Sequence, residues 1–188
     1  MMNLPRYVKV VEVGPRDGLQ NEKGVVPLAA KIGFVEALAD AGLPVVEAGA
    51  FVRPDRVPQM ADSEKVFQGI RKNPGTVYSA LVPNRQGFER ALAAGANEIG
   101  VFTAASEAFN RKNINASIAE SIDRFGEFVP DAKKAGIRVR AYVSTSWVCP
   151  YAGPVEPAAV LDVARRLERL RMTVAGSSQT RDQRSSNA

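Results

Sequence analysis

The residues best suited to chemistry lie close together near the N-terminus, in the stretch Val13-Gly14-Pro15-Arg16-Asp17-Gly18-Leu19-Gln20. This stretch follows the apolar run Val8–Val13, a β-branched pattern typical of a strand that is buried on both faces. Opposite charges at the mouth of a core are costly unless they pair or hold an ion. The sequence therefore predicts that Arg16 and Asp17 take part in metal-assisted chemistry on a carbonyl compound. The alternative is a structural ion pair that pins the first loop.

The composition is that of an ordinary globular protein. The chain has 188 residues, of which 45% are hydrophobic and 24% charged, enough for one or two domains. The single cysteine, Cys149, excludes an internal disulfide and fits a reducing compartment. The sequence has no apolar run of membrane-spanning length and no signal sequence. We therefore expect a cytoplasmic protein without membrane partners. The net charge of +5 indicates a mildly basic surface or a polyanionic ligand such as a coenzyme A ester, and the scattered basic residues argue against nucleic acid. Histidine, the commonest general base and transition-metal ligand, is absent.

Strand-like and helix-like segments alternate along the chain. An Ala-Gly pair occurs three times, at Gly42, Gly95 and Gly136, and each pair is expected to end a helix just before a strand. Gly126 and Pro130 predict a break inside the longest helix. Strands are expected over 8–13, 44–47, 76–82, 98–103 and 137–144, and helices over 27–41, 63–71, 86–94, 117–134 and 157–172.

This order predicts an α/β fold, a parallel (β/α) barrel of TIM type that is incomplete, with about five of eight βα units. A doubly wound sheet is the alternative, but no Gly-x-Gly-x-x-Gly follows the first strand. Residues 1–172 would form the partial barrel, while 173–188, where Val174 is the one large apolar residue, would be a disordered or aberrant tail without a sixth strand. Chemistry in such barrels occurs at the carboxyl ends of the strands, where the polar residues are Arg16, Asp17, Glu47, Asn84, Ser106 and Ser144.

An ordered set of motifs resembles the hydroxymethylglutaryl-CoA (HMG-CoA) lyase family of the DRE-TIM metallolyase superfamily. The matching segments are Val11–Glu22, Phe51-Val52, Val57–Met60, Lys112–Asn115, Tyr142–Ser144 and Cys149–Tyr151. The resemblance implies retro-Claisen cleavage of 3-hydroxy-3-methylglutaryl-CoA to acetoacetate and acetyl-CoA. It also implies an acyl-CoA as the small-molecule partner and a homodimer as the assembly.

The resemblance further implies roles for individual residues. Asp17 would be a ligand of Mg²⁺ or Mn²⁺, while Arg16, clustered with Glu47, would neutralise the charge of the enolate as the bond breaks. Arg16 and Glu47 are thus the expected catalytic residues. The expected substrate-binding residues are Arg16, Gln20, Asn113 and Ser144.

The chain departs from the family in several places. The family's His-x-His metal ligands and the glycine-rich loop with its catalytic cysteine have no match, so Asp17 would be the one protein ligand, and Cys149 is not that cysteine. Gly49 and Ala50 stand where hydroxyl-bearing residues are usual. The loss of resemblance over Leu170–Ala188 suggests a frameshift, and the isolated chain is expected to be inactive. The alternatives are a non-catalytic fragment that binds an acyl-CoA or a partner, and a Claisen-condensing enzyme like isopropylmalate or homocitrate synthase.

Overall fold

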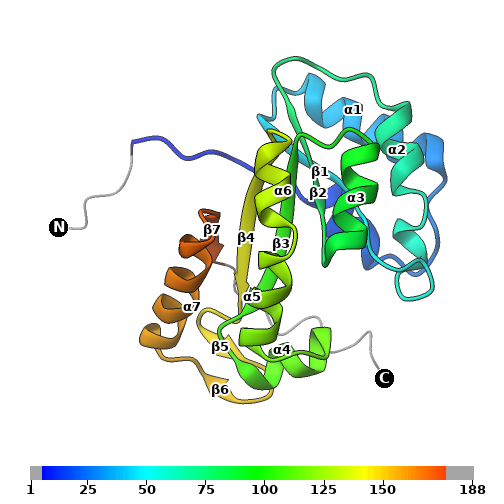
Figure 1. The fold of residues 1–188 in the computed structure, drawn as a ribbon. Helices are drawn as coiled ribbons and strands as arrows, with labels where there is room; N and C mark the ends of the chain where they lie inside the picture. The colour runs from blue at the N-terminus through cyan, green and yellow to red at the C-terminus, as the bar shows by residue number, and fades with distance from the viewer. Residues whose placement is uncertain (1–5, 177–188) are drawn as a thin grey trace. The chain divides into compact units, whose positions relative to one another are not determined.

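The computed structural model describes residues 6–176 (Figure 1), which form two compact units. The first unit comprises the chain up to Val82 together with Glu89–Glu98. The second comprises Pro83–Phe88 and the chain from Ile99 onward, so α3 (Arg85–Ala93) contributes residues to both. No helix among the described residues is long and apolar enough to span a bilayer.

The first unit is built on two parallel strands. Its elements in chain order are the π-helical turn η1 (Gly14–Gly18), α1 (Leu28–Asp40), β1 (Val45–Ala50), the 3₁₀ turn η2 (Pro58–Met60), α2 (Ser63–Gly69) and β2 (Val77–Leu81). Strand β1 pairs in parallel with β2, with Val45 opposite Val77 and Glu47 opposite Ser79. Both α1 and α2 pack against β1. All six residues of β1 are buried, which explains why its sequence is a continuous run of small and apolar residues with one glutamate.

The second unit contains the strands β3, β4 and β7, paired in that order, and a separate two-stranded antiparallel sheet of β5 and β6. Helix α6 packs on β4, and α7 packs on β4 and β7. The side chain of Phe128 is fully buried, with ring centroids 5.7 Å from Phe88 and 6.4 Å from Phe125. The elements are β3 (Glu98–Ala104, of which Glu98 belongs to the first unit), α4 (Glu107–Ile114), α5 (Ile118–Gly126), α6 (Val129–Lys134), β4 (Arg138–Ser144), β5 (Val148–Cys149), β6 (Gly153–Pro154), α7 (Pro157–Arg169) and β7 (Thr173–Gly176).

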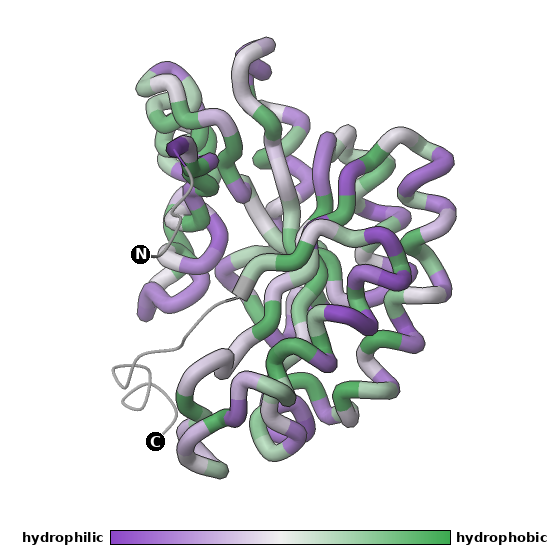
Figure 2. The backbone as a smooth tube through the Cα atoms, turned by 90° about the vertical axis from the view of Figure 1, so that its left-hand side faces the viewer, coloured by the Kyte–Doolittle hydropathy of each residue, from purple (hydrophilic) through white to green (hydrophobic). Residues whose placement is uncertain are grey.

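The helices end at the glycines that the sequence predicts as helix ends. Gly42, Gly95 and Gly136 have φ values of +85°, +76° and +74°, a backbone conformation that glycine adopts without strain. The expected helix over 117–134 is broken into α5 and α6, with Pro130 in the first turn of α6. Along their length the helices alternate between hydrophilic and hydrophobic colouring, as elements with one buried face do (Figure 2).

The first expected strand is wrong. Over 6–13 the structure shows a single β-bridge, between Glu12 and Val46, and no strand. The side chains of Tyr7, Val8 and Val10 are exposed, by 76%, 75% and 55%. A β-branched run reports a preference for extended backbone, but a strand also needs a partner along its whole length, and β1 offers one at its first residues alone.

The tail prediction is wrong for its first four residues. Thr173–Gly176 forms β7, which pairs in parallel with β4 so that Arg140 lies opposite Thr173 and Val143 opposite Gly176. Main-chain hydrogen bonds to an open strand edge do not need large side chains. A strand can therefore form here without the apolar run on which strand prediction relies. The rest of the expected tail, 177–188, lies outside the described residues.

Candidate active site

The turn η1 aims the charged residues at the start of β1. The backbone N–H groups of Arg16 and Asp17 both donate to the carbonyl oxygen of Val13, at 3.1 and 2.6 Å. The N–H of Gly14 donates to Glu12 Oε1 at 2.6 Å, and a Cβ atom on Gly14 would lie 2.8 Å from that oxygen. A side chain at this position would displace the carboxylate of Glu12, so glycine permits this contact. Single π-helical turns of this kind occur frequently at functional sites.

An arginine held between two carboxylates forms the centre of the site. Arg16 Nε donates to Glu47 Oε1 at 2.5 Å, and Arg16 Nη1 donates to Asp17 Oδ1 at 2.7 Å. The side chain of Glu47 is fully buried in β1, that of Arg16 is 13% exposed, and that of Asp17 is 47% exposed. The cluster thus runs from a buried carboxylate, through a nearly buried guanidinium, to a carboxylate in contact with solvent.

This arrangement fixes a positive charge in space. A guanidinium stays protonated at any working pH, and its planar fork is oriented by the two carboxylates. Charge interactions are stronger where water is excluded, so a ligand oxygen that becomes negative beside Arg16 would be stabilised without reorganisation of the protein. The cluster is suited to stabilising an enolate or a similar oxyanion.

The described residues do not by themselves fit a divalent cation. They contain no group of three or more histidine, cysteine, aspartate or glutamate side chains that could hold a metal, and the chain as a whole has no histidine. The one oxygen ligand expected, from Asp17, accepts a hydrogen bond from the guanidinium of Arg16 through its Oδ1 atom. Among residues 6–176 the cluster is therefore an arginine held by two carboxylates, without a complete set of metal ligands.

The other expected binding residues are divided between the two units. Gln20 belongs to the first unit, three residues after Asp17, and its Oε1 atom is buried without a hydrogen-bond partner among residues 6–176. Ser144 and Asn113 belong to the second unit. Ser144 is 8% exposed at the end of β4, where its carbonyl oxygen accepts from Ala105 N–H at 2.9 Å. Asn113 lies in the last turn of α4 and is exposed.

Two further polar residues from the strand ends act as helix caps. Asn84 Oδ1 accepts from the N–H of Gly87 at 2.9 Å, at the start of α3. Ser106 is the N-cap of α4, where its Oγ accepts from Phe109 N–H at 3.3 Å, and the same Oγ donates to Cys149 Sγ at 3.0 Å. Their position after a strand was predicted; in the structure Asn84 caps α3, and the Ser106 hydroxyl both caps α4 and contacts the Cys149 thiol.

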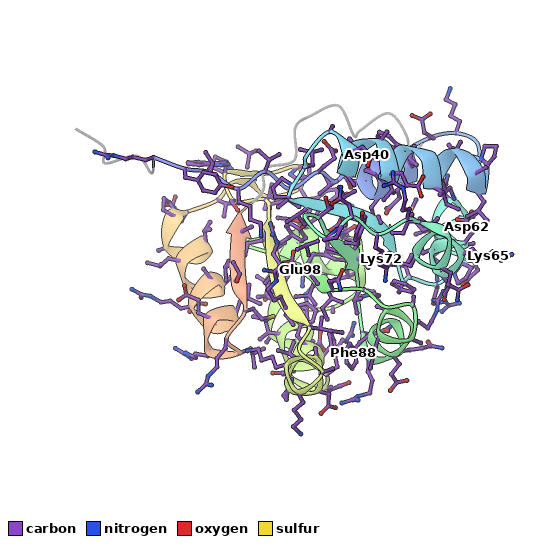
Figure 3. All side chains as sticks on the ribbon, turned by 90° about the horizontal axis from the view of Figure 1, so that it is seen from above. Asp40, Asp62, Lys65, Lys72, Phe88 and Glu98 are labelled. Carbon is purple, nitrogen blue, oxygen red and sulfur yellow. The ribbon has the colours of Figure 1, made fainter. Side chains whose placement is uncertain are left out.

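Sequence reasoning missed a buried lysine that secures the loops beside the cluster. Lys31 of α1 is 3% exposed, and its Nζ donates to Gln59 O at 2.5 Å and to Asp62 Oδ1 at 2.6 Å (Asp62 is labelled in Figure 3). Gln59 Nε2 in turn donates to Glu22 O at 3.0 Å. These bonds tie the loop after η1 to the loop after β1. The available signal was a lysine that follows two alanines on the apolar side of an expected helix.

The departures from the family pattern at Gly49 and Ala50 also have a local explanation. The N–H of Ala50 donates to Ser63 Oγ at 3.1 Å, and Ser63 Oγ donates to Met60 O at 2.8 Å. A Cβ atom on Gly49 would lie 2.7 Å from Ser63 Oγ. Ser63, the first residue of α2, therefore supplies a hydroxyl at the end of β1 from another element.

Comparison with known proteins identifies the family. The HMGL-like family model matches residues 7–181. The chain is 56% identical over 167 residues to mitochondrial hydroxymethylglutaryl-CoA lyase of Rattus norvegicus, covering 89% of this chain and 51% of the rat protein. It is 53% identical over 169 residues to the 3-hydroxy-3-isohexenylglutaryl-CoA/hydroxymethylglutaryl-CoA lyase of Pseudomonas aeruginosa, covering 90% of this chain and 56% of that protein.

Solved structures agree with the family match. The crystal structure of the Pseudomonas aeruginosa HMG-CoA lyase superposes with a TM-score of 0.90 at 51% identity, over 94% of this chain and 59% of that chain. An HMG-CoA lyase from Acinetobacter baumannii in complex with coenzyme A and 3-methylmalate superposes with a TM-score of 0.84 at 33% identity, over 88% of this chain and 54% of that chain. The predicted fold class, an incomplete TIM-type α/β barrel, is confirmed. The chain spans about half the length of the curated relatives it matches, and over that length it belongs to the HMGL-like family.

Proposed function

We propose that the chain provides the arginine–carboxylate part of an HMG-CoA lyase active site, which cleaves 3-hydroxy-3-methylglutaryl-CoA to acetoacetate and acetyl-CoA. In this carbon–carbon lyase reaction a base removes the proton of the 3-hydroxyl group, and the oxygen electron pair forms the carbonyl of acetoacetate. The C2–C3 bond breaks, its electron pair becomes the enolate of acetyl-CoA, and a proton added at C2 completes the product. The negative charge passes from the 3-oxygen to the enolate oxygen as the bond breaks, and a fixed guanidinium beside the enolate oxygen lowers the energy of the transition state.

The observation that carries this proposal is the position of Arg16 between Glu47 and Asp17, with 13% of its side chain exposed. Arg16 would stabilise the enolate oxygen, and Glu47 would act as a positioning residue that holds the guanidinium at a fixed angle. Gln20 would offer its unpartnered Oε1 to a ligand donor. Asn113 and Ser144 remain proposed contacts of the acyl-CoA.

No step is assigned to the Mg²⁺ or Mn²⁺ ion that the family resemblance implies, because the described residues do not fit it. Asp17 would be one carboxylate ligand, and Mg²⁺ takes six ligands in near-octahedral geometry. We therefore propose that the 188-residue chain binds the acyl-CoA without turning it over. Cleavage of the bound acyl-CoA is what distinguishes the lyase function from the non-catalytic binding function.

The proposal is tested by isothermal titration of the chain with 3-hydroxy-3-methylglutaryl-CoA. We expect the wild-type chain to bind and Arg16→Gln to weaken binding at least about tenfold, since a buried charge-assisted contact contributes more than about 1.5 kcal/mol. The matched control is Arg71→Gln, which removes an arginine of the same unit that pairs with Asp40 at the surface. Equal loss of affinity in both variants, or no binding by the wild-type chain, would contradict the proposal.

The location and the ligand class are part of the same proposal. Curated relatives named as cytoplasmic and as mitochondrial lyases both match this chain, the first at 56% identity in Danio rerio and the second at 56% in Rattus norvegicus. We propose a cytoplasmic location and an acyl-CoA ligand, the latter supported by the coenzyme A in the related Acinetobacter structure. Immunofluorescence of the tagged chain against a mitochondrial marker tests the location.

A further inference from the structure

A buried hydroxyl in β2 has no partner. Ser79 is the middle residue of β2 (Val77–Leu81) and is 2% exposed. Its Oγ atom makes no hydrogen bond to any group among the described residues. Buried polar side chains are hydrogen-bonded in the large majority of cases, and an unpartnered one is costly, so this exception needs an explanation.

The strand register places Ser79 beside the arginine site. Ser79 lies opposite Glu47 in the parallel pairing of β1 with β2. Opposed residues of paired strands project to the same face of a sheet, and neighbouring strands lie about 4.7–4.9 Å apart. The Ser79 hydroxyl is therefore next to the carboxylate that holds Arg16, on the same face of the β1–β2 pair.

Other buried hydroxyls of the first unit are used within the fold. Ser63 Oγ both accepts from Ala50 N–H and donates to Met60 O. Thr76, the residue directly before β2, donates from Oγ1 to Leu43 O at 2.9 Å. A hydroxyl kept for the fold has a partner in the fold. Ser79 differs from these residues because its hydroxyl has no hydrogen-bond partner among the described residues and because it lies opposite Glu47.

We propose that Ser79 is a binding residue of this site and that its Oγ donates a hydrogen bond to an oxygen atom of the acyl group of the ligand. The inference rests on the proposed function and extends it from the charged cluster to the neighbouring strand. An acyl group with carboxylate, hydroxyl or thioester oxygens provides the acceptor that Ser79 lacks, and Arg16 provides the opposite charge. Ser79 then sets a preference for an oxygen-rich acyl group over a purely apolar one.

The test compares Ser79→Ala with the matched control Thr76→Val in the full 188-residue chain. Affinity for 3-hydroxy-3-methylglutaryl-CoA is measured by isothermal titration, and the urea midpoint is measured without ligand. We expect Ser79→Ala to bind about 5- to 20-fold more weakly while its midpoint stays the same or rises, because the removed hydroxyl had no partner. Thr76→Val should show the reverse, with a lower midpoint and unchanged affinity.

The results distinguish a role of the Ser79 hydroxyl in ligand binding from a role in the fold. If Ser79→Ala binds as tightly as the wild-type chain while Arg16→Gln binds weakly, the inference about Ser79 is overturned and the proposed function stands. If Ser79→Ala lowers the midpoint as Thr76→Val does, the hydroxyl serves the fold and the inference is again overturned. If the wild-type chain does not bind the ligand, both proposals are wrong.

Discussion

Replacing Glu47 by glutamine would test whether the arginine site depends on a buried charge pair. The substitution keeps the size and shape of a side chain that is fully buried in β1, and removes the negative charge that Arg16 Nε contacts at 2.5 Å. Arg16 would keep one carboxylate, that of Asp17 at 2.7 Å, but that side chain is 47% exposed and therefore screened by water. The guanidinium would be left largely buried with weaker compensation.

The expected cost follows from this burial. Removing one partner of a buried ion pair costs about 3–5 kcal/mol, because the other charge is left without compensation. Glutamine can still accept one hydrogen bond, and Asp17 still neutralises part of the charge, so we expect the free energy of unfolding to fall by about 2–3 kcal/mol. The matched control is Asp55→Asn, which removes a carboxylate that pairs with Arg53 at the surface, with side chains 58% and 69% exposed. That control should leave the free energy of unfolding unchanged within error.

The assay is equilibrium unfolding in urea at pH 7, followed by far-ultraviolet circular dichroism. A double-mutant cycle with Arg16→Gln isolates the pair, and we expect a coupling energy of about 1–3 kcal/mol between Arg16 and Glu47. A Glu47→Gln variant that unfolds at the same urea concentration as Asp55→Asn would refute the reasoning. So would additive losses in the cycle, since additivity would mean that the two side chains do not depend on each other.

The remaining predictions concern the backbone and the buried thiol. Gly136→Ala should lower the free energy of unfolding by about 1 kcal/mol, because φ is +74° there, whereas Gly126→Ala, where a Cβ meets nothing within 4 Å, should raise it by about 0.5 kcal/mol. If the urea midpoints of Gly136→Ala and Gly126→Ala shifted in the same direction, both predictions could not hold. Burial raises the pKa of the Cys149 thiol, but the hydrogen bond from Ser106 and three backbone hydrogen bonds hold that pKa below its ordinary value, so Ser106→Ala should shift the thiolate absorbance at 240 nm to higher pH. Because a lowered thiol pKa stabilises the folded state at high pH, the wild-type advantage over Ser106→Ala should shrink as the pH falls through the thiol titration, and an unshifted absorbance curve would contradict the assignment.

Local sequence signals predicted the parts of the fold that local physics controls. Glycine is the residue that tolerates a positive φ, and so the three Ala-Gly pairs marked three helix ends correctly. The break between α5 and α6 followed from Gly126 and Pro130, which weaken a helix whatever surrounds it. The strands β1, β2, β3 and β4 each overlap an expected segment, because buried parallel strands need continuous apolar runs.

Pairing partners could not be predicted in the same way. The run Val8–Val13 has a stronger strand signal than Thr173–Gly176, yet the structure gives the former one bridge and the latter a full pairing with β4. Strand formation depends on an available edge, which is a property of the assembled sheet rather than of the segment. The same limit applies to Ser106, whose position after a strand predicted a site residue but whose hydroxyl caps α4.

The residue types in the chain define the chemistry that is available: an arginine and an aspartate at a glycine turn, a glutamate in a buried strand, and no histidine in the chain. How these charges compensate one another depends on the folded arrangement. Glu47 lies 31 residues from Arg16, and it is the bridge between the first segment and β1 that brings the two side chains together. The register of β1 against β2 likewise brings Ser79 to the same face as Glu47. Contacts between distant residues depend on packing of the whole sheet, and no spacing in the sequence encodes that packing locally.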